Sequence, residues 1–298
     1  MGGLSVLSPP LMASMRTPSR NRPRPPRLRS TLRKLAKSHP YMSAHLLEAD
    51  KLRDARLAQY ASGVRLAGYE ELQAHLEAVA VAFVGDDVLR NLAFLVVRAK
   101  GDFQTCLEAT LSGYPAVAQE SMRDVMEIEF LLRDFYFEPT HITKWLECSD
   151  KERNDRFRPA VLRQRYAARL GKQPQDLGEA ADYKGHSMFL HVSPHLNPFG
   201  GPGLVADSSP FCVDSCFWEL FEHARRVVYA LHFLRRRISP KLKIKSLAPR
   251  SLKKLRLGWQ QTQTMQTVWL AMMQVMRDEQ ATALPGSSPS TAREQSHR

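Results

Sequence analysis

Apolar side chains recur at helical spacing along most of this sequence, and they never alternate with polar ones for long enough to form a convincing strand. Steps of three and four residues are typical of an amphipathic helix, because an α-helix turns once every 3.6 residues. One such stripe consists of Leu89, Leu92, Ala93, Val96, Phe103 and Leu107. The pattern predicts an all-α fold, an irregular multi-helix bundle with long antiparallel helices.

Capping residues and helix breakers divide this pattern into separate helices. Asp86 or Asp87 can cap a long helix that ends at Gly113. Pro115 suits the first position of the next helix, where no N–H is needed. Other helices are expected near residues 43–61 with Ser43 as the cap, 70–83, 115–137, after Pro139, after a Ser149–Glu152 capping box, 159–170, 183–191, 211–237 and 250–280.

The two ends of the chain differ in composition from the middle. Six prolines and six arginines lie within residues 9–29, a composition that favours solvated, extended backbone. We predict a disordered Arg/Pro-rich arm at 1–39, a single helical domain at 40–280 and a disordered Ser/Pro-rich tail at 281–298. The arm has three interpretations: a polyanion-binding segment, an organelle transit peptide, or a start placed too early. We favour the last, since Met12, Met15 and Met42 are alternative initiators.

The net charge of +13 is unevenly distributed. Residues 1–47 hold nine Lys and Arg and no acid, and residues 223–277 hold thirteen and again no acid. Residues 48–222 hold 19 bases against 27 acids, a net charge of −8. This arrangement indicates an acidic body with two basic segments rather than a uniformly basic nucleic-acid-binding protein.

No apolar run approaches the ~20 residues that span a bilayer, so we predict no membrane segment and a cytoplasmic protein. The cysteines at 106, 148, 212 and 216 follow no secretory signal and lack a second pair at zinc-ligand spacing. We therefore expect buried thiols and no metal site. Gly-rich phosphate loops and nucleophile elbows are also missing, so no cofactor is indicated.

Two groups of polar residues interrupt the apolar helices. Arg123 and Glu127 are four residues apart, hence on one helix face, either as a solvated pair or as a buried pair that orients a site. Tyr183, Ser187 and His191 share a face in the same way and would suit anion binding or acid–base chemistry, unless His191 is a structural residue near a helix end. A metal site at His186, His191 and His195 is disfavoured, because 186 and 191 lie on different faces.

These residues, with Trp145 and with Ser193-Pro194 after His191, resemble the motifs of a bacterial all-helical family of unknown function (DUF5677) over about Leu89–Pro194. The resemblance implies a helical fold similar to HEPN proteins, several of which are metal-independent RNases. In such an enzyme Arg123 would bind phosphate and His191 would act as acid and base, while Glu127, Tyr183 and Ser187 would orient them.

The HEPN motif itself, Arg and His separated by four to six residues, occurs at chance frequency here. Its matches are Arg33 with His39, and Arg225 and Arg226 with His232. About three such pairs are expected at random in a chain with ten histidines. The motif therefore identifies no site.

A basic region follows the longest C-terminal helix. It contains Arg235, Arg236, Arg237, Lys241, Lys243, Lys245, Arg250, Lys253, Lys254 and Arg256. It is either a polyanion-binding surface or a solvated surface that pairs with the acidic body. Few aromatic residues stand among these charges, so base stacking is not indicated. We predict a module that contacts RNA or another polyanion in a bacterial stress or defence system; the alternatives are a HEPN-like RNase and a module that binds a protein partner.

Overall fold

The fold is all-α, as the sequence predicts. A computed structural model describes residues 28–177, 183, 210–244, 252–263 and 267, and no strand occurs among them. The chain divides into two compact units at residues 50 and 51, within α2 (Pro40–Tyr60). Among the described residues, no helix combines the length and the apolar character needed to cross a bilayer.

The unit up to Asp50 contains α1 (Leu28–Leu35) and the first part of α2. The prediction of a disordered arm through residue 39 is therefore wrong for residues 28–35. The reason is local: the prolines stop at Pro26, and Leu28, Leu32 and Leu35 then recur at helical spacing. Leu32 is buried, with 3% of its surface exposed.

The start of α2 also differs from the prediction. The helix begins at Pro40 instead of after Ser43, because proline at a helix start has a suitable φ and lacks the N–H that would stay unpaired there. Ser43 lies inside the helix and is buried, so it is not the cap.

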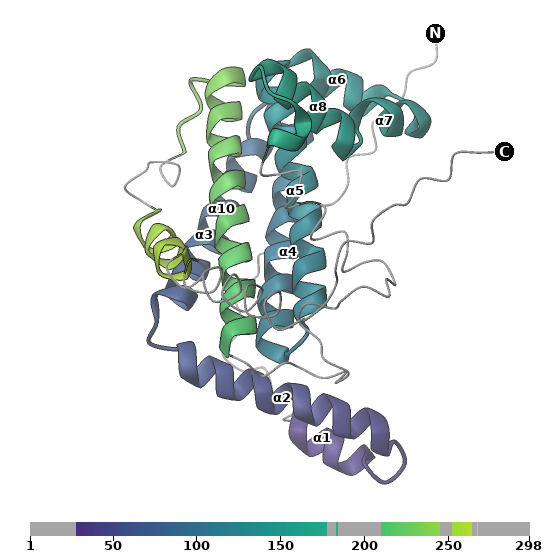
Figure 1. The fold of residues 1–298 in the computed structure, drawn as a ribbon, viewed down its shortest axis with the longest axis vertical. Helices are drawn as coiled ribbons and strands as arrows, with labels where there is room; N and C mark the ends of the chain where they lie inside the picture. The colour runs from purple at the N-terminus through teal and green to yellow at the C-terminus, as the bar shows by residue number, and fades with distance from the viewer. Residues whose placement is uncertain (1–27, 178–182, 184–209, 245–251, 264–266, 268–298) are drawn as a thin grey trace, which may run out of the picture. The chain divides into compact units, whose positions relative to one another are not determined.

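In the unit from Lys51 on, four long helices lie side by side: α3 (Val64–Val84), α4 (Ala93–Ser112), α5 (Pro115–Phe137) and α10 (Pro210–Ile238) (Figure 1). α4 runs antiparallel to α3 and α5, and α10 runs beside α5 in the same direction. α3 begins at Val64, six residues before the predicted start, and Gly63 is its N-cap residue. α5 and α10 match the predicted ranges to within a residue.

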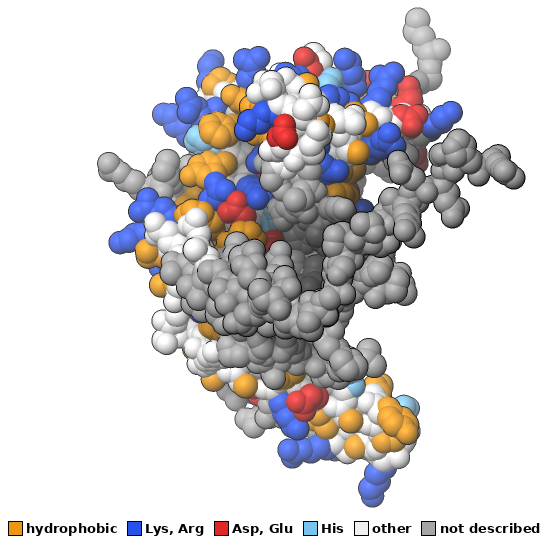
Figure 2. Space-filling model, in the orientation of Figure 1, with side chains coloured by type: hydrophobic (Ala, Val, Ile, Leu, Met, Phe, Trp, Pro, Cys, Tyr) orange, Lys and Arg blue, Asp and Glu red, His pale blue; other side chains and the backbone are white. Residues whose placement is uncertain are grey.

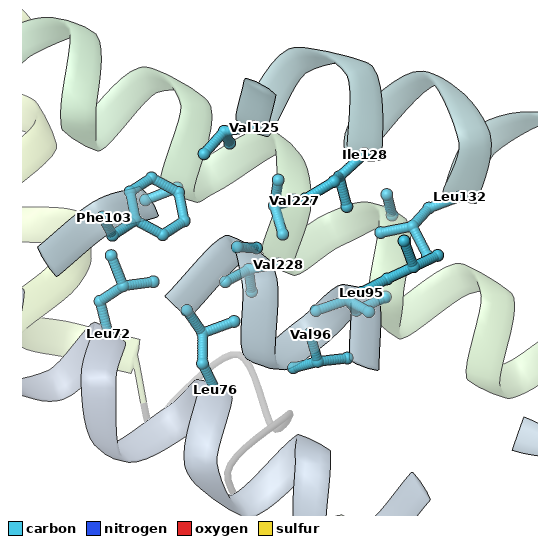
Figure 3. Close-up of a cluster of buried hydrophobic side chains, with 14 of the residues drawn as sticks. Leu72, Leu76, Leu95, Val96, Phe103, Val125, Ile128, Leu132, Val227 and Val228 are labelled. Atoms are coloured by element: carbon cyan, nitrogen blue, oxygen red, sulfur yellow. The ribbon is translucent and has the colours of Figure 1, made fainter. Parts of the chain in front are cut away.

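The core of this unit lies between these four helices. Leu72 and Leu76 of α3, Phe103 of α4 and Val227 of α10 point into one cluster, and Figure 3 shows them with Val125 and its neighbours on α5. Each large side chain of this kind contributes about 1.5–3 kcal/mol when fully buried. Val117, near the start of α5, is 43% exposed.

Specific residues set the ends of α4 and α5. Asp86 Oδ1 accepts hydrogen bonds from the backbone N–H groups of Val88 (3.1 Å) and Leu89 (3.0 Å). It thus pairs N–H groups just before and at the start of the 3₁₀ turn η1 (Leu89–Leu92), whose N-cap residue is Val88 and after which α4 begins. Gly113 ends α4 with φ of 89°, a left-handed conformation that favours glycine.

Four shorter elements follow α5: α6 (Thr140–Glu147), α7 (Asp150–Phe157), α8 (Pro159–Arg169) and η2 (Pro174–Asp176). The capping box predicted at the start of α7 is present, since Ser149 and Glu152 hydrogen-bond each other's backbone N–H. α6 and α8 pack on α5, and α8 lies at the end of the four long helices (Figure 1).

Residues 253–263 form a further helix, within the predicted range 250–280. It lies against α3 and α10, because Gly68 and Gly258 leave space for the buried ring of Phe221 between them. A Cβ atom on Gly258 would stand 2.8 Å from Cζ of Phe221. These glycines allow the helix backbone to approach closely.

Candidate functional site

Three of the five predicted catalytic residues lie together. The Tyr183 hydroxyl donates a hydrogen bond to Glu127 Oε1 at 2.8 Å and accepts one from Arg123 Nε at 3.1 Å. Arg123 Nε and Glu127 Oε1 are themselves 3.7 Å apart. Both α5 residues are part-buried, so the pair is neither fully solvated nor fully buried. Ser187 and His191 lie outside the described residues, as do His186 and His195.

Arg163 of α8 joins this cluster, which the sequence did not indicate. Its guanidinium carbon lies 4.4 Å from the centre of the Tyr183 ring. Its Nη1 is buried with no hydrogen-bond partner among the described residues, and burial lowers its pKa. Burial also raises the pKa of Tyr183, so the phenol stays protonated. The cluster holds two arginines against one glutamate and has a net positive charge.

Arg235, the first residue of the predicted basic region, turns back toward the protein. Its Nη1 donates to the backbone carbonyl of Leu242 at 3.0 Å, and burial lowers its pKa. It therefore holds the segment after α10 in place. Lys245 and Arg250 lie outside the described residues.

The other seven residues of that region are exposed, and we call them the basic surface. They are Arg236, Arg237, Lys241, Lys243, Lys253, Lys254 and Arg256. Figure 2 shows Lys and Arg side chains along the edge of one face, over the end of α10 and the helix at 253–263. Within the described part of the chain, none of the seven forms an ion pair with an acid.

A pocket of about 460 Å³ lies between α5, α8 and α10, and we call it the α5–α10 pocket. This volume is within the usual range for small-molecule sites. The lining consists of arginines, aromatic rings, one glutamate and one alanine: Arg133, Tyr136, Phe137, Tyr166, Glu222, Arg225, Arg226, Tyr229, Ala230 and Phe233.

Glu222 organises the charges of this pocket. Its carboxylate accepts hydrogen bonds from Arg225 Nη2 at 2.7 Å, from Arg226 Nε at 2.9 Å and from the indole N–H of Trp259 at 2.8 Å. Burial opposes its ionisation, but the two arginines outweigh burial and lower the pKa of Glu222 to about 2. Arg133 is paired with the buried Glu129 at 2.5 Å. The three arginines exceed these two acids, so the pocket keeps a positive charge.

Aromatic rings form the other part of the wall. Tyr229 and Phe233 stack one turn apart on α10 with their centroids 6.3 Å apart, and Tyr136 of α5 is 5.8 Å from Phe233. Tyr229 is 52% exposed and Phe233 45%, so about half of each side chain faces solvent.

A sequence signal for this pocket exists. Arg225, Tyr229, Phe233 and Arg237 follow one another at intervals of four residues, which places two rings between two arginines along a slowly turning column on α10. These two rings come just before the basic region in the sequence, and on α10 Phe233 lies one turn before Arg236 and Arg237. The contributions from α5 and α8 carry no such signal.

The remaining candidate residues do not assemble. His232 is part-buried, and burial together with Arg235 and Arg236 lowers its pKa. Arg33 belongs to α1 and His39 precedes α2. Among the described residues, no group of three or more His, Cys, Asp or Glu could hold a metal ion. Cys106 and Cys216 are buried.

Comparison of the chain with models of known protein families, with curated proteins and with solved structures gave no match. The resemblance to DUF5677 and to HEPN proteins therefore stays a prediction, and function has to be argued from the site alone.

Proposed function

We propose that this chain is a helical module that contacts RNA or another polyanion through the basic surface. The observation that carries the proposal is the seven exposed cations that no acid of the described chain neutralises. A surface that served only to pair with the acidic body would have its cations in ion pairs. Unpaired cations gathered on two neighbouring elements instead suit a row of phosphates.

The test is the salt dependence of RNA binding. The full chain is titrated into a labelled single-stranded RNA at 50 and at 200 mM salt, and fluorescence anisotropy is measured. With about five phosphate contacts, each adding about −0.7 to the slope of log affinity on log salt, affinity falls roughly 100-fold across this range. A flat response contradicts the proposal and leaves a protein partner as the alternative.

Charge-matched variants locate the contact. Lys253→Glu with Lys254→Glu removes two cations of the basic surface, while Lys144→Glu with Lys151→Glu makes the same change at exposed positions on α6 and α7. We expect the first pair to weaken binding and reduce the salt slope, and the second pair to have a much smaller effect. Equal effects would mean that net charge alone drives binding.

A second function, RNA cleavage without metal, is favoured by the contacts among Arg123, Glu127 and Tyr183. In that case RNA incubated with the protein and a chelator is cut, and His191→Ala abolishes the cut. Arg123→Gln should reduce cleavage as well, because the guanidinium would bind phosphate. Cleavage that survives both substitutions excludes the assignment.

A further inference from the structure

The α5–α10 pocket contains features that packing does not require. Tyr229 and Phe233 expose about half of their surface at its rim, and burying them elsewhere would be favourable. They are stacked on each other and flanked by Arg225, whose guanidinium carbon lies 6.0 Å from the Tyr229 ring. Exposed rings beside arginines are a common surface for flat, negatively charged ligands.

The cations at this pocket are held in place by the fold. Glu222 binds Arg225 through two hydrogen bonds and Arg226 through one, and Trp259 occupies the remaining side of the carboxylate. Arg133 is likewise fixed by Glu129 on α5. Because these guanidinium groups are oriented before a ligand arrives, an anion would bind with little loss of side-chain entropy.

The pocket adjoins the basic surface. Arg236 and Arg237 follow Phe233 by three and four residues on α10, so they lie one turn beyond the rings. On the other side, Arg225 contacts the ring of Trp259, and Trp259 belongs to the helix that carries Lys253 and Lys254. A strand held by the basic surface would therefore pass the mouth of the pocket.

We propose that the α5–α10 pocket binds one nucleoside phosphate unit, with the base against Tyr229 and Phe233 and the phosphate against Arg225 and Arg226. The unit is either a free mononucleotide or one nucleotide of a bound strand. Binding of a nucleotide within a strand rests on the proposed function, whereas binding of a free mononucleotide does not. Rings of this kind stack on every base, so the site selects the nucleotide unit over an aliphatic phosphate rather than one base over another.

The test uses the full chain and three probes: AMP, ribose 5-phosphate and a ten-nucleotide single-stranded RNA. Tyr229→Ala with Phe233→Ala removes the stacking surface and leaves the Glu222 contacts intact. Phe94→Ala is the matched control, because Phe94 is an equally exposed ring on α4, 49% exposed. Calorimetric titration gives the affinities, and thermal unfolding verifies that each variant is folded.

We expect the double variant to bind at least one of AMP and the RNA roughly tenfold more weakly, as loss of base stacking requires. Ribose 5-phosphate should bind more weakly than AMP and should not respond. If the double variant loses affinity for the RNA alone, the ligand is a nucleotide of a bound strand. If it also loses affinity for AMP, the pocket binds a free mononucleotide as well.

Unchanged binding of both AMP and RNA in the double variant overturns the inference, and so does an equal loss in Phe94→Ala. If salt-sensitive RNA binding persists in that case, the basic surface is still supported and only the pocket assignment fails. If RNA does not bind at all while AMP binding depends on the rings, the pocket stands and the polyanion function fails.

Discussion

At the residue scale, Asp102 of α4 and Asp124 of α5 bring two carboxyl groups close together. Arg98 of α4 binds both oxygens of Asp124 at 2.6 and 2.7 Å. Asp102, one turn further along α4, is partly buried beside the same carboxylate. Burial and the negative charge of Asp124 raise the pKa of Asp102 from its usual 3.8 to about 7.

This pKa makes stability depend on pH. The native state keeps a proton that the unfolded chain releases near pH 4, so stability falls as pH rises from about 4 to about 7 and stays reduced above that. We expect Asp102→Asn, which cannot ionise, to raise the melting temperature more at pH 8 than at pH 5. Asp87→Asn, a change at an exposed acid, is the control and should shift the melting temperatures at pH 5 and at pH 8 by the same amount. If the melting temperatures of Asp102→Asn and of the parent protein change with pH in parallel, the assignment of the raised pKa to Asp102 is wrong.

The residue scale also shows how far spacing predicts contacts. The four-residue step from Arg123 to Glu127 puts both on one face of a helix, whatever the rest of the chain does. The contact of that pair with Tyr183, and of Tyr183 with Arg163, depends on how the chain after α5 packs back on it. Periodicity contains no information on that packing.

At the element scale, helix ends followed from residue types wherever the cause was local. Gly113, Pro115 and the Ser149–Glu152 box act through their own backbone or through neighbours three residues away. The errors at Ser43 and at residues 28–35 have the same origin: a second local signal was present, Pro40 in the first case and the leucine spacing in the other, and it starts the helix earlier than predicted.

Gly101 within α4 and Gly113 just after its end lead to opposite predictions. Gly113→Ala forces an L-residue into a left-handed conformation and should destabilise the protein by about 1 kcal/mol. Gly101→Ala lies within the helix, with no atom within 4 Å of the added Cβ, and should stabilise it by about 1 kcal/mol. Urea unfolding of both variants measures the difference. The same sign for both would contradict these backbone assignments.

At the scale of the whole unit, the helix at 253–263 is held by close backbone approach. Gly258 and Gly68 both face the ring of Phe221, which is fully buried on α10. Trp259 adds the hydrogen bond to Glu222. This attachment positions Lys253, Lys254 and Arg256 next to α10 and the α5–α10 pocket.

Gly258→Val should detach this helix in part, because the new side chain has to displace the Phe221 ring. Overpacking of this kind costs about 1–3 kcal/mol. We expect faster amide hydrogen exchange in residues 253–263 and a lower melting temperature. Gln261→Val introduces the same residue at an exposed position of the same helix. It should change the amide exchange rates and the melting temperature much less.

The sequence by itself determined the helical class, most helix ends and the separation of charge, because each depends on residue type and on neighbours within a turn or two. Only the tertiary structure decided that rings of α5 and α10 meet Arg133, Arg225 and Arg226 in one pocket, and that Trp259 of a later helix hydrogen-bonds to Glu222. The hydrogen bond from Trp259 to Glu222 joins residues 37 positions apart, and the ring contact between Tyr136 and Phe233 joins residues 97 positions apart. Packing of whole helices, which local spacing does not encode, brings such residues together.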